Sequence, residues 1–149
     1  MTILVNNAGA NRLSPFAYTP PSEWWNLMTV NCLGPIICTY SVINSMRKYN
    51  KGVIINVASR AGVVTGAMSS AYSASKAALI RATGNIQQEL IQEGKDGVSL
   101  FSLHPGGVQT AMNESMSLIS PAPTCAWRIS RPCACVWIVF QGGIGLSYS

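Results

Sequence analysis

A short apolar run at residues 53–58, VIINVA, constrains the fold of this chain more than any other stretch. Its β-branched residues are typical of a buried strand. Ser59 follows it directly, and the helical pattern that comes next carries Tyr72 and Lys76. Side chains at i and i+4 share one face of a helix, so Tyr72 and Lys76 should lie side by side. Because open α/β sheets bind ligands at the carboxyl ends of their strands, we expect these three side chains to meet there.

Ser59, Tyr72 and Lys76 together suit a proton-transfer step. A free Tyr phenol has a pKa of about 10, and a neighbouring ammonium favours the phenolate form. Tyr72 beside Lys76 would therefore serve as a general acid or base, while Ser59 would hydrogen-bond a substrate oxygen. The Y-x-x-x-K spacing alone is weak evidence, because it arises by chance in many chains.

Three further motifs occur in order along the chain: Asn6-Asn7-Ala8-Gly9, Val30-Asn31-Cys32-Leu33-Gly34 and Pro105-Gly106-Gly107-Val108-Gln109-Thr110. Each motif is weak when taken alone. Together with Ser59 and Tyr72-x-x-x-Lys76, they make residues 1 to about 112 resemble a classical short-chain dehydrogenase/reductase.

The resemblance implies an oxidoreductase that interconverts a carbonyl and an alcohol with NAD(H) or NADP(H). It implies a catalytic tetrad in which Tyr72 moves the proton and Ser59 polarises the substrate oxygen. Lys76 would tune Tyr72 and hold the ribose, and Asn31 would extend the proton relay. The implied cofactor contacts are Asn6, Ala8, Gly9, Tyr72, Lys76, Pro105, Gly106, Val108 and Thr110. No metal ligand is expected.

The implied fold class is α/β, a partial doubly wound (Rossmann-like) parallel sheet with flanking helices. We expect the first βαβαβ half of the family fold, with its Gly-rich phosphate-binding loop, to be missing, which would leave Ile3–Val5 as a bare strand edge. The chain alone is therefore expected to be inactive and to bind dinucleotides weakly. The alternative is a non-catalytic truncated isoform or gene-model fragment, at most a dimerisation partner of a full-length relative.

The remaining elements are predicted from local signals. Ser22 should cap a helix that runs towards Val30 and Asn31. Gly34-Pro35 should bend or restart this helix, which should continue over residues 36–46. A second helix is predicted over residues 71–93 and a further strand over residues 98–103.

Two regions are predicted along the chain. Residues 1–126 would form the C-terminal portion of a dehydrogenase domain, and residues 127–149 an aberrant, poorly packed tail. Residues 133–149 carry no charge and show no helix or strand period. We attribute this tail to a reading-frame error or an alternative splice.

Composition narrows the functional classes. The net charge of +5 comes from scattered Lys and Arg residues, which argues against a nucleic-acid partner. No apolar run is expected to reach membrane-spanning length, no signal peptide is evident, and the five Cys residues lack zinc or disulfide spacing. We therefore predict a cytoplasmic protein with a small-molecule carbonyl or alcohol substrate and no membrane partner, whose intact relatives are homo-oligomers.

Overall fold

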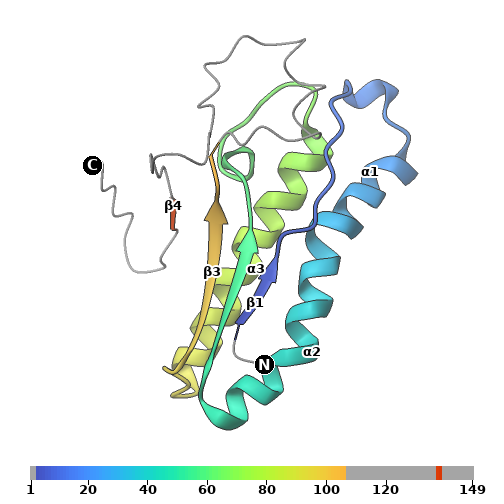
Figure 1. Ribbon diagram of the computed structural model, residues 1–149. Helices are drawn as coiled ribbons and strands as arrows, with labels where there is room; N and C mark the ends of the chain where they lie inside the picture. Colours follow the sequence, from blue (N-terminus) through green and yellow to red (C-terminus); the bar gives the residue numbers. More distant parts are fainter. Residues whose placement is uncertain (1–2, 107–136, 139–149) are drawn as a thin grey trace, which may run out of the picture.

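The computed structural model describes residues 3–106 and 137–138. A parallel sheet lies at its centre, made of β1 (Ile3–Asn6), β2 (Gly52–Val57) and β3 (Val98–His104). A short strand, β4 (Trp137–Ile138), pairs antiparallel with β3, so the order is β1-β2-β3-β4 (Figure 1). The three strands predicted from the apolar runs are confirmed, and β4 is an element that the sequence pattern did not predict.

Helical crossovers join the parallel strands. Between β1 and β2 the chain runs through α1 (Pro21–Met28), a π-helical turn η2 (Thr29–Leu33) and α2 (Gly34–Tyr49). Between β2 and β3 it runs through α3 (Ser70–Gln92). Two 3₁₀ turns, η1 (Phe16–Tyr18) and η3 (Arg60–Gly62), lie in the loops that follow β1 and β2. Parallel strands require such crossovers, and this arrangement is the α/β fold that the resemblance implied.

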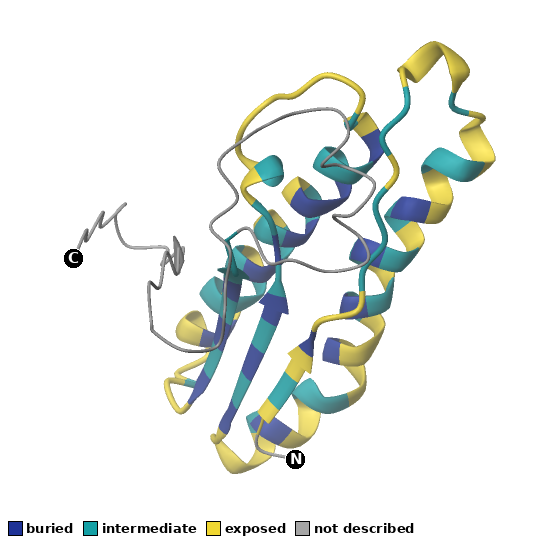
Figure 2. Cartoon of the chain, turned by 45° about the horizontal axis from the view of Figure 1, so that its top comes forward, coloured by how far each residue is buried: buried dark blue, intermediate teal, exposed yellow. Residues whose placement is uncertain are grey.

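Helices α2 and α3 pack on the same face of the sheet. Alternate residues of β2 and β3 point into this layer, which gives the strictly alternating burial visible in Figure 2. The core cluster contains side chains from both helices and two strands: Met46, Ile54, Leu90, Val98 and Leu100. The buried residues of α3 recur from Ala71 to Leu90, so this helix packs inward along much of its length.

The opposite face of the sheet is apolar as well. Ile3 and Val5 of the edge strand β1 are 61% and 54% exposed. Within residues 3–106 no helix covers this face, although parallel sheets usually carry helices on both sides. The expectation that Ile3–Val5 forms a bare strand edge is confirmed for the described part of the chain.

The first helix differs from its predicted form. It begins at Pro21, where a fixed φ suits the first helical position, and Ser22 is not its cap. The predicted bend or restart at Gly34-Pro35 is confirmed as a restart, because the π-helical turn η2 ends at Leu33 and α2 begins at Gly34, while the chain stays helical from Pro21 to Tyr49. The π-helical turn η2, which precedes Pro35, accommodates this proline within the helical segment.

By length and composition this Pro21–Tyr49 helix would suffice to cross a membrane, which corrects the prediction that no apolar run is long enough. Its buried residues recur nearly every fourth position, the spacing of a helix packed on a sheet. They are Leu27, Asn31, Pro35, Thr39 and Met46. Two of them are polar and form hydrogen bonds to the sheet layer or to α3. The segment therefore packs on the sheet by one side only, and most of its apolar window is left unburied within the described residues.

Candidate active site

Ser59 follows β2 at the carboxyl edge of the sheet. Its backbone is extended, and its Oγ accepts a hydrogen bond from the backbone N–H of Ala61 at 3.2 Å. This bond caps the short turn η3. A hydroxyl also has an O–H donor and a second lone pair, so Ser59 can still bond a ligand oxygen.

The η3 turn lies directly against α3 because residue 62 is glycine. A Cβ on Gly62 would lie 2.8 Å from the backbone carbonyl carbon of Lys76 and 2.9 Å from the backbone nitrogen of Ala77. Such contacts are too close for any side chain, so glycine allows the loop after Ser59 to approach the helix turn that holds Lys76.

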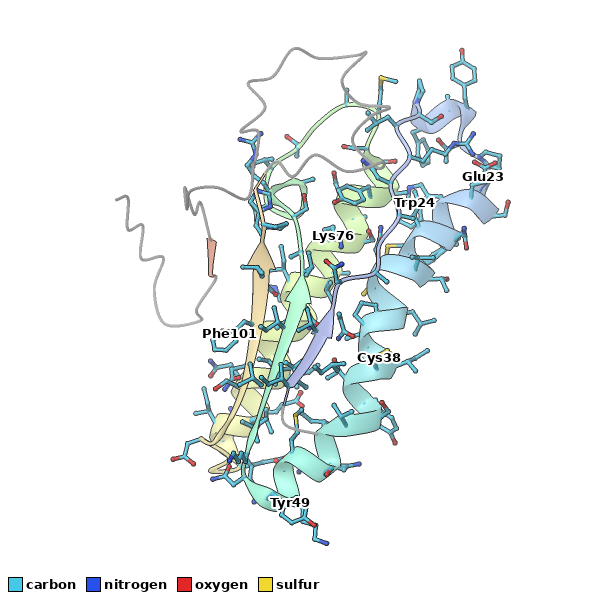
Figure 3. All side chains as sticks on the ribbon, viewed as in Figure 1. Glu23, Trp24, Cys38, Tyr49, Lys76 and Phe101 are labelled. Atoms are coloured by element: carbon cyan, nitrogen blue, oxygen red, sulfur yellow. The ribbon has the colours of Figure 1, made fainter. Side chains whose placement is uncertain are left out.

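Tyr72 and Lys76 lie one turn apart on α3, as their spacing predicted. The Lys76 Nζ lies 5.9 Å from the centre of the Tyr72 ring. Lys76 is only 4% exposed, and its Nζ donates a hydrogen bond to the backbone carbonyl of Val57 at 2.7 Å. Val57 ends β2, so this bond connects α3 to the strand end that Ser59 follows (Figure 3).

The ammonium of Lys76 is held in a poorly solvated position. Burial lowers the pKa of Lys76, and the Cys32 thiol acts weakly in the opposite direction. The pKa of the Cys32 thiol is raised by its own burial despite the nearby ammonium. An ammonium has three N–H donors, and one of them goes to Val57. The others are suited to ligand hydroxyl groups.

Asn31 lies in the π-helical turn η2 and is fully buried. Its Oδ1 accepts from the backbone N–H of Ala10, and its Nδ2 donates to the Ala10 carbonyl, both at 2.8 Å. The Nδ2 also donates to the Oγ of Ser75 at 3.1 Å. Both N–H donors of the side chain are thus used within the fold. Pro35 has no N–H, which removes the α-helical partner of the Asn31 carbonyl.

Asn6 belongs to a buried polar chain on the helix side of the sheet. Its Nδ2 donates to Asn56 Oδ1 at 2.7 Å, with longer contacts to the Pro35 carbonyl and Thr39 Oγ1. Asn56 in turn donates to Thr83 Oγ1 on α3 at 2.9 Å. The Asn6 side chain therefore connects β1 to β2 and α2, and its expected cofactor role stays a prediction.

The other expected cofactor residues follow β1 and β3. Ala8 is exposed and Gly9 half-buried in the loop after β1, while Pro105 and Gly106 follow β3 at the same sheet edge as Ser59. Gly106 has a φ of +80°, a conformation that favours glycine. Val108 and Thr110 lie outside the described residues, as does the predicted boundary between residues 126 and 127.

The structure brings Asn31, Ser59, Tyr72 and Lys76 to the carboxyl edge of the sheet. Sequence reasoning missed two further members of this cluster, Ser75 and Cys32. A signal for Ser75 was available, because it lies three residues after Tyr72 and so shares its helix face. The contact of Ser75 with Asn31 depends on tertiary packing, and no local sequence pattern predicts it. In the described part of the chain, no cluster of His, Cys, Asp and Glu side chains could hold a metal ion.

Comparison with known proteins agrees with this geometry. The family model for short chain dehydrogenases matches residues 1–118. The chain belongs to the short-chain dehydrogenase family. It is 32% identical over 143 residues to the short chain dehydrogenase mpl6 of Monascus purpureus, which covers 93% of this chain and 47% of that protein. The chain thus spans about half the length of the curated relatives it matches.

Solved structures of the same family share the fold. A gluconate 5-dehydrogenase from Burkholderia cenocepacia, in complex with NADP and tartrate, aligns with a TM-score of 0.72 and 28% identity. The alignment covers 81% of this chain and 46% of that one. A 4-hydroxyisoleucine dehydrogenase complexed with NADH and succinate aligns with a TM-score of 0.67 and 31% identity, covering 78% and 49%. Each of these two neighbours was solved with a nicotinamide dinucleotide bound.

Proposed function

We propose that this chain carries the proton-transfer half of an NAD(P)(H)-dependent oxidoreductase that interconverts a carbonyl and an alcohol. The observation that carries the proposal is the buried Lys76 ammonium, bonded to the end of β2 and placed one helical turn from Tyr72. Burying a charged lysine costs free energy unless the ammonium has good hydrogen-bond partners. Its retention at this depth favours a functional role.

Each side chain has a distinct part in the proposed reaction. Tyr72 gives its phenolic proton to the carbonyl oxygen during reduction and takes it back during oxidation. Ser59 donates a hydrogen bond to the same oxygen. Lys76 lies beside Tyr72 on the same helix, and it holds the cofactor ribose. The Asn31 side chain holds the surrounding backbone, and its carbonyl is the group that a relay water would use.

The residues present fit the nicotinamide end of the cofactor. The two Lys76 donors that remain beside its bond to Val57 suit ribose hydroxyls, and Gly106 leaves open space at the end of β3. Pro105, Gly106, Ala8 and Gly9 would line the same edge. When bound, the nicotinamide supplies or accepts the hydride. The choice between NAD and NADP stays open.

Partner and location complete the proposal. The substrate is a small-molecule carbonyl or alcohol, and the location is cytoplasmic. A groove between α2 and α3 is lined by apolar side chains that include Tyr40, Ile43 and Ile86, together with Arg47, Glu89 and Glu93, and Tyr40 is 75% exposed. Such a surface supports self-association of the intact protein.

The test uses a family-length protein in which these residues follow a dinucleotide-binding half, because the chain spans about half the length of its curated relatives. In that protein Lys76→Met should weaken cofactor binding and lower turnover together, since the ammonium serves both the ribose and Tyr72. The measurement is NAD(P)H fluorescence titration beside steady-state turnover with alcohols and ketones.

Lys51→Met is the matched control, because Lys51 is exposed and lies at the opposite end of β2. It should change neither quantity. If Lys76→Met kept both the affinity and the turnover of the unmodified protein, the proposed role of this lysine would be wrong.

A further inference from the structure

Ser75 lies between Tyr72 and Lys76 on α3 and is fully buried. Its Oγ donates to the backbone carbonyl of Tyr72 at 2.7 Å and accepts from Asn31 Nδ2 at 3.1 Å. The hydroxyl proton is thus used within the helix, while the oxygen receives a bond from a different element. The Ser75 side chain therefore connects two elements. It lies in the turn of α3 that carries Tyr72 and Lys76, and it is hydrogen-bonded to the π-helical turn η2.

The connection continues beyond Asn31. The same amide forms a pair of 2.8 Å hydrogen bonds with the backbone N–H and carbonyl of Ala10, in the loop after β1. A two-point bond of this kind fixes the orientation of the amide plane as well as its position. The link thus runs from α3 through η2 to the first strand loop, and all of its side chains are buried.

We propose that Ser75 is a positioning residue, which holds the first turns of α3 against Asn31 and so sets where Lys76 and Tyr72 stand. This inference rests on the proposed function, because it assigns Ser75 a task in the same site. Without the Ser75 oxygen, the buried Asn31 N–H has no acceptor, and water or a shifted helix must supply one. Either change admits solvent to the neighbouring Lys76.

The experiment reports on Lys76 directly and needs no turnover. The chain contains four lysines, so lysine labelled with ¹³C at Cε gives four signals whose pH midpoints can be followed by NMR. The loss of one signal in Lys76→Met assigns it. The groups that act on the Lys76 ammonium are the Cys32 thiol from η2 and the Tyr72 ring from its own helix.

Burial lowers the pKa of Lys76 in the unmodified chain. In Ser75→Ala the Lys76 midpoint should move up from its value in the unmodified chain. Ser73→Ala is the matched control, because Ser73 lies on the same helix but contacts Ser69, and it should leave the midpoint in place. Ser75→Thr keeps the hydroxyl and should also leave it in place.

If Ser75→Ala does not fold, Ser75→Cys provides a milder change, because sulfur is a weak hydrogen-bond acceptor. Ser75→Cys should move the Lys76 midpoint in the same direction by a smaller amount. An unchanged Lys76 midpoint in a folded Ser75→Ala or Ser75→Cys chain would overturn the proposal. So would an equal shift in Ser73→Ala. Failure of the proposed function would instead appear as unchanged turnover in Lys76→Met, so the two failures are distinguishable.

Discussion

Replacing Thr83 by Val tests whether the buried polar chain on the helix side of the sheet holds α3 in place. Thr83 is 3% exposed, and its Oγ1 accepts from Asn56 Nδ2 at 2.9 Å and donates to the Leu79 carbonyl at 2.7 Å. Valine has nearly the same shape but lacks the oxygen. The substitution therefore removes the bonds without opening a large cavity.

The expected loss of stability comes from the Asn56 side chain, which loses its hydrogen-bond acceptor. Asn56 is fully buried, so its Nδ2 would keep an N–H without an acceptor, which destabilises a protein by about 1–3 kcal/mol. The lost bond to Leu79 matters less, because that carbonyl also lies within the α-helical hydrogen-bond pattern. We expect the free energy of unfolding to fall by about 2 kcal/mol, or a melting temperature about 4–8 °C lower for a domain of this size.

The assay is urea unfolding followed by tryptophan fluorescence, with thermal melting as a second measure. Thr29→Val is the control, because the Thr29 Oγ1 donates to the Trp25 carbonyl in the same local manner but is exposed. It should change the free energy of unfolding by less than about 0.5 kcal/mol. If Thr83→Val proved as neutral as Thr29→Val, the reasoning about this polar chain would be refuted.

Two further predictions concern the site. Gly62→Ala should destabilise the fold by about 1–3 kcal/mol, because its Cβ would meet the α3 backbone. Gly66→Ala should be nearly neutral, since its Cβ would meet only Ser69 Oγ at 3.5 Å; equal melting temperatures for the two variants would contradict this. Because burial lowers the pKa of Lys76 in the folded chain, the unfolded chain binds more protons between that pKa and the ordinary value of about 10.4. Stability relative to Lys76→Met should therefore rise with pH across this window, and a fall in urea-melting experiments would show that the sign is wrong.

The strands and α3 could be predicted from the sequence because their signals are local. The apolar runs place β1, β2 and β3 to within one residue at most of their ends, and the predicted helix over residues 71–93 differs from α3 (Ser70–Gln92) by one residue at each end. The spacing of Tyr72 and Lys76 was enough to place them together. These features depend only on side-chain period and on glycine or proline at element ends.

The rest depends on contacts between distant segments. Gly34-Pro35 predicted a bend or restart of the helix, but not that a π-helical turn would accommodate the missing N–H. The Lys76 bond to Val57 and the Asn31 bond to Ser75 join residues 19 and 44 positions apart. No local pattern encodes either pairing, so the supporting contacts of the site appear only in the structure.

The most direct test of the central claim is the turnover of Tyr72→Phe in a family-length protein that contains these residues. Removing the phenolic oxygen should lower kcat by about 10²–10⁴-fold and leave cofactor affinity nearly unchanged, because the phenol acts on the proton in transit. Tyr49→Phe, at the far end of α2 and 70% exposed, should keep full activity (Figure 3). A Tyr72→Phe protein that retained most of its turnover would contradict the account.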